Sequence, residues 1–194
     1  MSETFKNMFS LEGIDGSGKT TQTPFIKESL ERAGFTVRIF KNPSTGLLGE
    51  FIRKNVRLFE PWLRNRLFIL DMQATLMNQE KNHDPNTILI WDRYIDSFYA
   101  SNQEMTISNA VNLVANMPVP AKTFWLDIDP MIVLSQRSEA TDDHSDPEWL
   151  SLKQHRYGEL FQRYPQRIVR IDGQQSINKI TNQIVDEIIK TMRQ

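Results

Sequence analysis

The feature that most constrains this chain is a segment near its amino terminus, Gly13-Ile14-Asp15-Gly16-Ser17-Gly18-Lys19-Thr20. It satisfies the pattern G-x-x-x-x-G-K-[ST], and it lies between a short hydrophobic run and a segment with helical periodicity, which is the context that the pattern requires. Glycines let main-chain N–H groups converge on phosphate oxygens, and the amino terminus of the following helix adds partial positive charge. The segment therefore predicts a phosphate-binding loop between a β-strand and an α-helix.

Strand-like and helix-like segments alternate along the rest of the chain. Segments rich in β-branched and aromatic residues predict strands at residues 7–12, 35–41, 86–92, 121–127 and 167–172. Segments with helical spacing predict helices at residues 19–33, 47–55, 61–82, 94–103, 107–117, 130–137, 147–164 and 176–192. The alternation predicts an α/β fold: one domain, residues 1–194, with three α/β/α layers around a five-stranded parallel sheet.

Composition excludes several classes of protein. Lys and Arg number 23 against 24 Asp and Glu, so no general positive field attracts nucleic acid or a membrane surface. Cysteine is absent, which excludes a disulfide framework, a thiolate zinc site and a cysteine nucleophile. The apolar run at residues 87–91 is too short to span a bilayer. We expect a cytoplasmic protein with neither nucleic acid nor membrane as a partner.

The residue types of the loop and of the strand at residues 86–92 indicate triphosphate chemistry. Lys19 is expected to reach the β- and γ-phosphates, and Thr20 offers a hydroxyl to Mg²⁺. Asp92 closes the apolar strand and is a second candidate for Mg²⁺. Arg93 follows at once, at the carboxyl edge of the predicted sheet, where ligands of such sheets bind.

Two motifs, residues 12–22 (EGIDGSGKTTQ) and Asp92-Arg93-Tyr94, make the chain similar to the thymidylate kinase family. Weaker matches in the right order occur at residues 40–43, 46–53, 67–68, 126–130, 137, 171–172 and 176–177. The resemblance implies a P-loop kinase with a short lid that uses ATP and Mg²⁺ to phosphorylate a deoxynucleoside monophosphate, dTMP to dTDP. It also implies a homodimer built from helices on one face, with the helix at residues 61–82 as a candidate.

The resemblance also assigns residues to roles. The ATP-binding set is Gly13, Gly16, Ser17, Gly18, Lys19, Thr20, Thr21 and Arg137. The acceptor-binding set is Asp15, Phe40, Lys41, Phe68, Met72, Arg93, Ser97, Phe98 and Ser101. The metal set is Thr20 and Asp92, and the catalytic set is Lys19, Arg93, Asp15 and Arg137. These sets suit phosphoryl transfer, which depends on positioning and charge neutralisation more than on a strong base.

Four positions depart from the family's pattern. Met72 stands where the family has an arginine that reads a thymine carbonyl, and Phe98 stands where a polar residue lies beside the base. Ser101 replaces a tyrosine that senses the sugar, and Asn42 replaces a carboxylate. A site that loses hydrogen-bonding groups discriminates less between acceptors. A kinase of nucleosides or other small molecules is therefore an alternative.

The predicted lid, approximately residues 138–150, is acidic. Residues 138–152 contain no Lys or Arg, and they hold Glu139, Asp142, Asp143, Asp146 and Glu148. Such a segment repels polyphosphate unless cations compensate. A nucleotide-binding protein with weak turnover is thus a second alternative. The resemblance implies a catalytic arginine in the phosphate loop or in the lid, and neither segment contains one. Arg137, Lys153 and Arg156 flank the lid and are candidates for that role.

Overall fold

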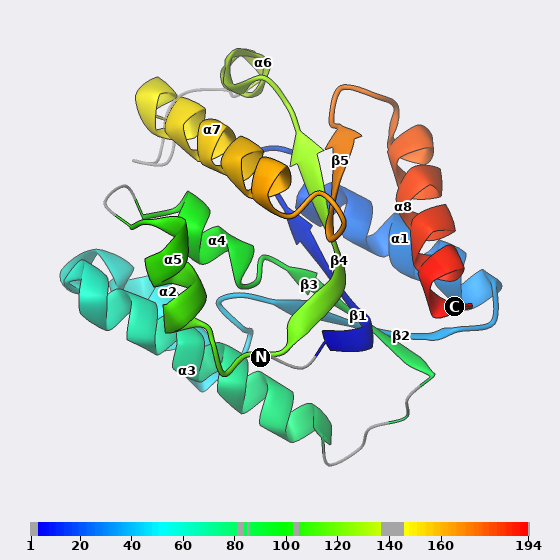
Figure 1. The fold of residues 1–194 in the computed structure, drawn as a ribbon, viewed down its shortest axis with the longest axis horizontal. Coiled ribbons are helices and arrows are strands. Elements are labelled where there is room, and N and C mark those ends of the chain that lie inside the picture. Colours follow the sequence, from blue (N-terminus) through cyan, green and yellow to red (C-terminus); the bar gives the residue numbers. More distant parts are fainter. Residues whose placement is uncertain (1–3, 81–83, 85, 103–104, 137–145, 194) are drawn as a thin grey trace.

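The structure, a computed structural model, describes residues 4–80, 84, 86–102, 105–136 and 146–193. Its strands are β1 (Thr4–Glu12), β2 (Thr36–Lys41), β3 (Thr87–Asp92), β4 (Val119–Asp127) and β5 (Ile168–Asp172). They form one parallel sheet in the order β2-β3-β1-β4-β5 (Figure 1). Because β2 and β3 lie on one side of β1 and β4 and β5 on the other, the carboxyl end of β1 is the switch point where such sheets bind ligands.

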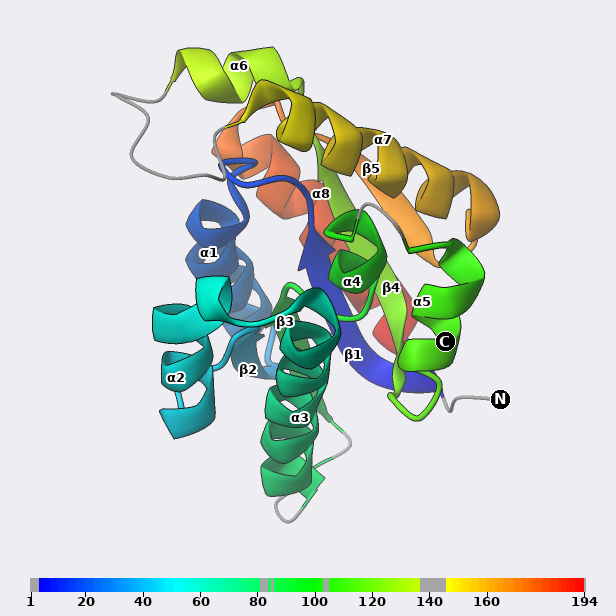
Figure 2. The ribbon, with the colours of Figure 1, turned by 90° about the vertical axis from the view of Figure 1, so that its left-hand side faces the viewer.

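Helices cover both faces of the sheet. Their bounds are α1 (Lys19–Arg32), α2 (Leu47–Asn55), the 3₁₀ turn η1 (Val56–Leu58), α3 (Pro61–Glu80), α4 (Asp96–Ala100), α5 (Ile107–Leu113), α6 (Pro130–Ser135), α7 (Pro147–Arg163) and α8 (Ile177–Met192). Helices α1 and α8 lie on one face, and α3, α4, α5 and α7 lie on the other (Figures 1 and 2). The predicted three-layer α/β/α fold is confirmed. Within the described part of the chain, no helix has the length and apolar character needed to cross a membrane.

Strand β3 contributes apolar side chains to both layers. Ile88 and Ile90 pack in the cluster that includes residues of α1 and α8, whereas Leu89 and Trp91 pack on the side of α3. All of β3 is buried, which explains its continuous apolar sequence. This burial fixes β3 beside β1.

The structure corrects the ends of several predicted elements. Strands β1 and β4 begin earlier than expected, at Thr4 and Val119. The helix expected at residues 94–103 is the short α4, because Arg93 has a φ of 69° and the Tyr94 N–H donates to the Glu12 side chain instead of continuing a helix. The helix expected at residues 107–117 ends at Leu113.

The predicted lid falls mostly on residues that the structure does not describe. Arg137 and residues 138–145 lie outside the described residues. Asp146 caps α7 by accepting a hydrogen bond from the main-chain N–H of Glu148 at 3.0 Å. Residues 147–150 are therefore the first turn of α7.

The turn after β2 is held by Asp71, a buried residue of α3. Asp71 accepts hydrogen bonds from the main-chain N–H and from the hydroxyl of Ser44, both at 2.6 Å. Helix α2 packs against the same turn at Gly49, where a Cβ atom would lie 2.0 Å from the Ser44 carbonyl oxygen. A glycine is therefore required here, although glycine disfavours helix interiors.

This packing predicts opposite effects for two helical glycines. We expect Gly49→Ala to lower the free energy of unfolding by about 2 kcal/mol or more, because Ser44 main-chain atoms must move. Gly158→Ala in α7 is the matched control, since its Cβ atom would meet only the Trp125 ring at 3.9 Å. It should raise the free energy of unfolding by up to about 1 kcal/mol. Urea denaturation of both variants measures the two changes, and a shared sign would contradict this account.

Candidate active site

The phosphate loop joins β1 to α1 at the carboxyl edge of the sheet. Gly13 has a φ of +143°, and a Cβ atom there would lie 2.7 Å from Ser17 Oγ and 2.8 Å from the Leu126 carbonyl oxygen. Only glycine fits this conformation and this space. Gly16 and Gly18 also have positive φ angles. The loop therefore turns with its main chain exposed toward the space that a phosphate would occupy.

Lys19 lies inside this loop. Its Nζ donates to the carbonyl oxygens of Gly13 at 3.0 Å and Ile14 at 2.7 Å, and to Ser17 Oγ at 3.2 Å. Burial above all, and then the charge of Arg93, lowers the pKa of Lys19 to about 7. An ammonium group in this position gains strongly from an anionic ligand that compensates for its burial.

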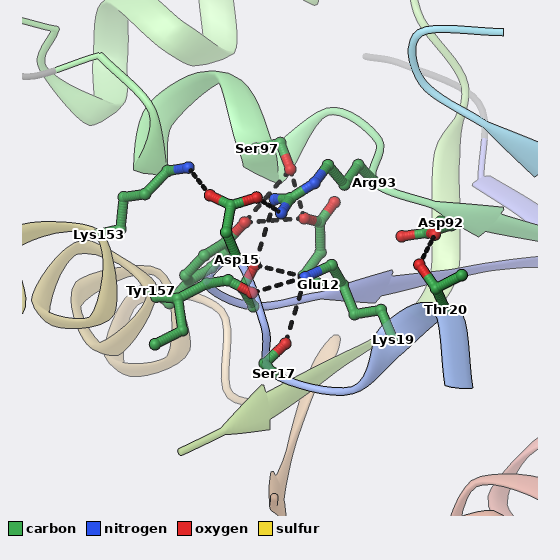
Figure 3. A network of polar contacts seen from close by, with 12 residues as sticks. Glu12, Asp15, Ser17, Lys19, Thr20, Asp92, Arg93, Ser97, Lys153 and Tyr157 are labelled. Atoms are coloured by element: carbon green, nitrogen blue, oxygen red, sulfur yellow. Dashed lines mark hydrogen bonds and ion pairs between the residues drawn. The ribbon is translucent and has the colours of Figure 1, made fainter. Parts of the chain in front are cut away.

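Thr20 and Asp92 form a pair of oxygen donors next to the loop. The Thr20 hydroxyl donates to Asp92 Oδ2 at 3.2 Å, and Asp92 comes from the end of β3 (Figure 3). Hydroxyl and carboxylate oxygens are the ligands that Mg²⁺ prefers, with phosphate and water oxygens completing its shell. Thr20 and Asp92, which form the predicted metal set, therefore offer ligands of the kind that suits Mg²⁺. Thr21 lies beside them at the start of α1 and is exposed.

Asp15 is the centre of the polar contacts in Figure 3. Arg93 Nη2 donates to Asp15 Oδ1 at 2.6 Å, and Lys153 Nζ donates to Oδ2 at 2.8 Å. A second nitrogen of Arg93, Nη1, donates to the Gly13 carbonyl oxygen at 3.2 Å. Burial opposes ionisation of Asp15, but Arg93 and then Lys153 outweigh burial and hold its pKa well below the usual range. Asp15 therefore stays ionised and joins the loop, the end of β3 and helix α7.

Lys153, which the sequence offered only as one of three cations that flank the predicted lid, contacts Asp15 from α7. It is buried, and its Nζ lies 5.4 Å from the centre of the Trp149 ring one turn earlier on α7. Arg93 and Lys153 both bind one carboxylate, Asp15, and the charge of Lys19 also acts on it. Cations gathered in a largely buried site favour the binding of an anion.

Arg156, another candidate cation, binds main-chain groups of a different segment. The Arg156 guanidinium donates to the carbonyl oxygens of Tyr99, at 2.8 Å, and Met105, and it stacks 3.9 Å from the centre of the Tyr99 ring. Arg156 therefore braces α4 and the segment after it. Arg137 lies outside the described residues.

Glu12 is a buried acid that sequence reasoning recorded only as part of the motif. Its Oε1 accepts from the Tyr94 N–H at 2.7 Å, and its Oε2 accepts from the hydroxyls of Ser97 at 2.6 Å and Tyr157 at 3.0 Å. Burial, and then the charge of Asp96, raises the pKa of Glu12 to about 7. The sequence feature that could have singled out Glu12 is its position: it is a carboxylate at the end of a buried strand, directly before the loop.

The apolar residues of the acceptor set lie together on the α3 side of the sheet. Phe40 and Phe68 are half-buried against a cluster that contains Met72 and Phe98, both buried. Phe68 and Phe98 meet edge to face with ring centroids 6.4 Å apart. Met72 has no exposed surface, so direct contact between Met72 and an acceptor requires rearrangement of this cluster.

The polar residues of the acceptor set are spread along the edge of the same region. Lys41 is exposed at the end of β2, opposite Asp92 in the sheet register. The Ser97 hydroxyl is engaged with Glu12, and Ser101 is half-buried at the end of α4. The structure thus brings Asp15, Arg93 and Ser97 into one network. Ser101 meets it through its main chain, because its N–H donates to the Ser97 carbonyl oxygen at 2.9 Å.

A phosphate loop between a parallel strand and a helix, facing a carboxylate and an arginine at the end of the neighbouring strand, defines the P-loop phosphotransferases. The sequence profile described as thymidylate kinase matches residues 11–184. The chain belongs to the thymidylate kinase family. It is accordingly an ATP-dependent nucleoside monophosphate kinase.

Curated relatives match over nearly their whole length. The thymidylate kinase of Thermoanaerobacter sp. (strain X514) is 30% identical over 195 residues, which cover 93% of this chain and 96% of the relative. A probable thymidylate kinase of Methanosphaera stadtmanae is 33% identical, covering 94% and 97%. The thymidylate kinase of Mycoplasma capricolum is 29% identical, covering 95% of each.

Proposed function

We propose that the chain transfers the γ-phosphoryl group of ATP to dTMP, giving dTDP. The observation that carries the proposal is that Arg93 and Lys153 both bind Asp15, directly beside the phosphate loop that holds Lys19. This is the edge of the sheet at which a donor in the loop and an acceptor phosphate on Arg93 would approach each other. Membership of the thymidylate kinase family names dTMP as the acceptor.

The donor would be held mainly by the loop. Main-chain N–H groups from Gly13 to Thr21 would surround its phosphates, and Lys19 would leave its carbonyl partners for the β- and γ-phosphates. Thr20 and Asp92 would hold Mg²⁺, which neutralises phosphate charge when it is bound. Arg137 stays a predicted ATP contact.

The acceptor would lie between Asp15, Arg93 and the Phe68 side of the apolar cluster. Arg93 offers two guanidinium nitrogens and would bind the acceptor phosphate, and the ionised Asp15 would accept from the sugar. Phe40 and Phe68 keep exposed surface against which a base could stack or pack. No strong general base is required, because the attacking oxygen of a monophosphate is already ionised near neutral pH.

Lys153 would supply the cation that residues 138–152 lack. Its ammonium already lies 2.8 Å from Asp15, so it reaches the centre of the site from α7 without help from the acidic segment. Near the transferring group, a positive charge in a buried site stabilises the charge that develops during transfer.

The proposal predicts the acceptor preference. The purified chain with ATP and Mg²⁺ should release ADP rapidly with dTMP and slowly with thymidine, because thymidine offers no phosphate to Arg93. A coupled ADP-release assay against dTMP, dUMP, dCMP, thymidine and deoxycytidine measures this. Turnover of nucleosides alone would favour the small-molecule kinase, and bound ATP with no ADP release would favour the weakly active nucleotide-binding protein.

The proposal also predicts a specific role for Lys153. Lys153→Met should lower kcat for dTMP about 100-fold, with little change in the Kd for ATP, because the loop is untouched. Lys153→Arg keeps the charge and should recover part of the rate. Arg163→Met, at an exposed position on the same helix, is the control and should keep the wild-type rate. Equal rates for Lys153→Met and Arg163→Met would remove Lys153 from the mechanism.

We propose a homodimer, as the family resemblance implies, with α3 at its interface, and we add the neighbouring α2. Trp62, Leu70 and Met77 are exposed on α3, and at 100° per residue they fall within about 80° of one side. Leu47 and Phe51 expose apolar surface on the neighbouring α2. Several exposed apolar side chains on one side of a helix are typical of an interface.

The dimer proposal predicts the mass of the particle in solution. Sedimentation equilibrium at micromolar concentration should give twice the chain mass of 22.7 kDa, and Trp62→Glu should give the monomer. Val111→Glu on α5, a comparably exposed apolar position away from this face, should stay dimeric. A wild-type monomer would contradict the proposal.

A further inference from the structure

We infer that Glu12 is a positioning residue for phosphoryl transfer: it holds the main chain at Arg93 and ties it to helix α7. The inference rests on the proposed function, in which Arg93 and Lys153 act on phosphate groups. Glu12 has no exposed surface, so it acts only through the groups that it binds.

The main chain at Arg93 needs external support. Arg93 has a φ of 69°, a conformation that residues other than glycine avoid unless their surroundings enforce it. Two consecutive N–H groups are anchored to the end of β1: Arg93 N donates to the Leu11 carbonyl oxygen at 3.0 Å, and Tyr94 N donates to Glu12 Oε1 at 2.7 Å. The second anchor is a side chain, so substitution can remove it while leaving the main chain of β1 unchanged.

This turn directs the arginine side chain into the site. From this conformation the Arg93 guanidinium reaches back to the Gly13 carbonyl oxygen and to Asp15 Oδ1. If the Tyr94 N–H lost its acceptor in this buried place, the main chain would be expected to rotate toward another partner. The guanidinium would then move away from Asp15.

The second oxygen of Glu12 binds α7. Oε2 accepts from Tyr157 Oη, and Tyr157 lies four residues after Lys153, on the same side of the helix. Glu12 therefore contacts the support of Arg93 with one oxygen and the support of Lys153 with the other (Figure 3). Glu12 thus links the segments that carry the two cations, in addition to the direct bridge that Asp15 makes between them.

Two substitutions test the positioning role. Glu12→Met keeps the approximate size but removes both accepting oxygens, so the Tyr94 N–H loses its acceptor; kcat/KM for dTMP should fall about 100-fold while the Kd for ATP stays within about 2-fold. Tyr157→Phe removes the hydroxyl by which α7 binds Glu12 and Ser97 and should lower kcat/KM about 10-fold, which keeps the test available if Glu12→Met does not fold. Unchanged kcat/KM in a folded variant of either kind would overturn the inference.

A matched control separates positioning from general loosening of the helices. Tyr99 Oη donates to Glu159 at 2.5 Å, so it also links α4 to α7, but it makes no contact with Glu12. Tyr99→Phe should keep kcat/KM within about 2-fold of the wild type even if its melting temperature falls. An equal loss in Tyr99→Phe and Tyr157→Phe would show a merely structural role and overturn the inference.

A double-mutant cycle tests whether Glu12 acts through Arg93. If it does, Glu12→Met should cost little in a protein that already carries Arg93→Ala, because the guanidinium is no longer there to be positioned. Independent effects that multiply would overturn this part of the inference.

A structural readout keeps the inference distinct from the proposed function. If the wild type phosphorylates no acceptor, the proposed function fails, and the crystal structure of Glu12→Met still decides the role of Glu12. We expect Arg93 to leave the positive-φ region and its guanidinium to leave Asp15. An unchanged Arg93 in that structure would overturn the inference.

Discussion

The parallel pairing of β1 with β3 sets the position of almost every charged group in the site. Leu11 lies opposite Asp92 in the register, so the residues that follow each strand emerge side by side. The phosphate loop leaves β1 where Asp92 and Arg93 leave β3, and contacts such as Thr20 with Asp92 follow directly. The apolar burial of β3 on both faces stabilises this pairing, and through it the electrostatics of the site.

The sequence predicted those parts of the site whose residues are close together in the chain. The loop pattern located Gly13 to Thr20, and the apolar run ending at Asp92 located the strand that faces it. Contacts between distant segments were beyond such reasoning: Lys153 meets Asp15 across 138 positions and Tyr157 meets Glu12 across 145. Periodicity shows that α7 is a helix but not which of its side chains reach the loop. Arg156, an equal candidate by sequence, is committed to the carbonyl oxygens of Tyr99 and Met105.

The acceptor side shows a different limit of sequence reasoning. Met72 and Phe98 occupy positions assigned to base recognition by resemblance, yet both are buried in the α3 cluster, while Phe40 and Phe68 keep exposed surface. Resemblance to a family shows which position in the chain corresponds to a family site. The side chain at that position decides whether it is exposed or buried in the core. Burial of an apolar side chain at such a position stabilises the folded state, and the cluster closes around it.

Helix α3 has different roles on its two sides. Toward the sheet it carries Phe68 and, through Asp71, holds the turn that follows β2. Away from the sheet it presents Trp62, Leu70 and Met77. Since a helix moves largely as a rigid rod, anything that covers its outer side also restrains Phe68 and the turn that Asp71 holds. A change on the outer surface of α3 would therefore also act on the side of the helix that faces the sheet.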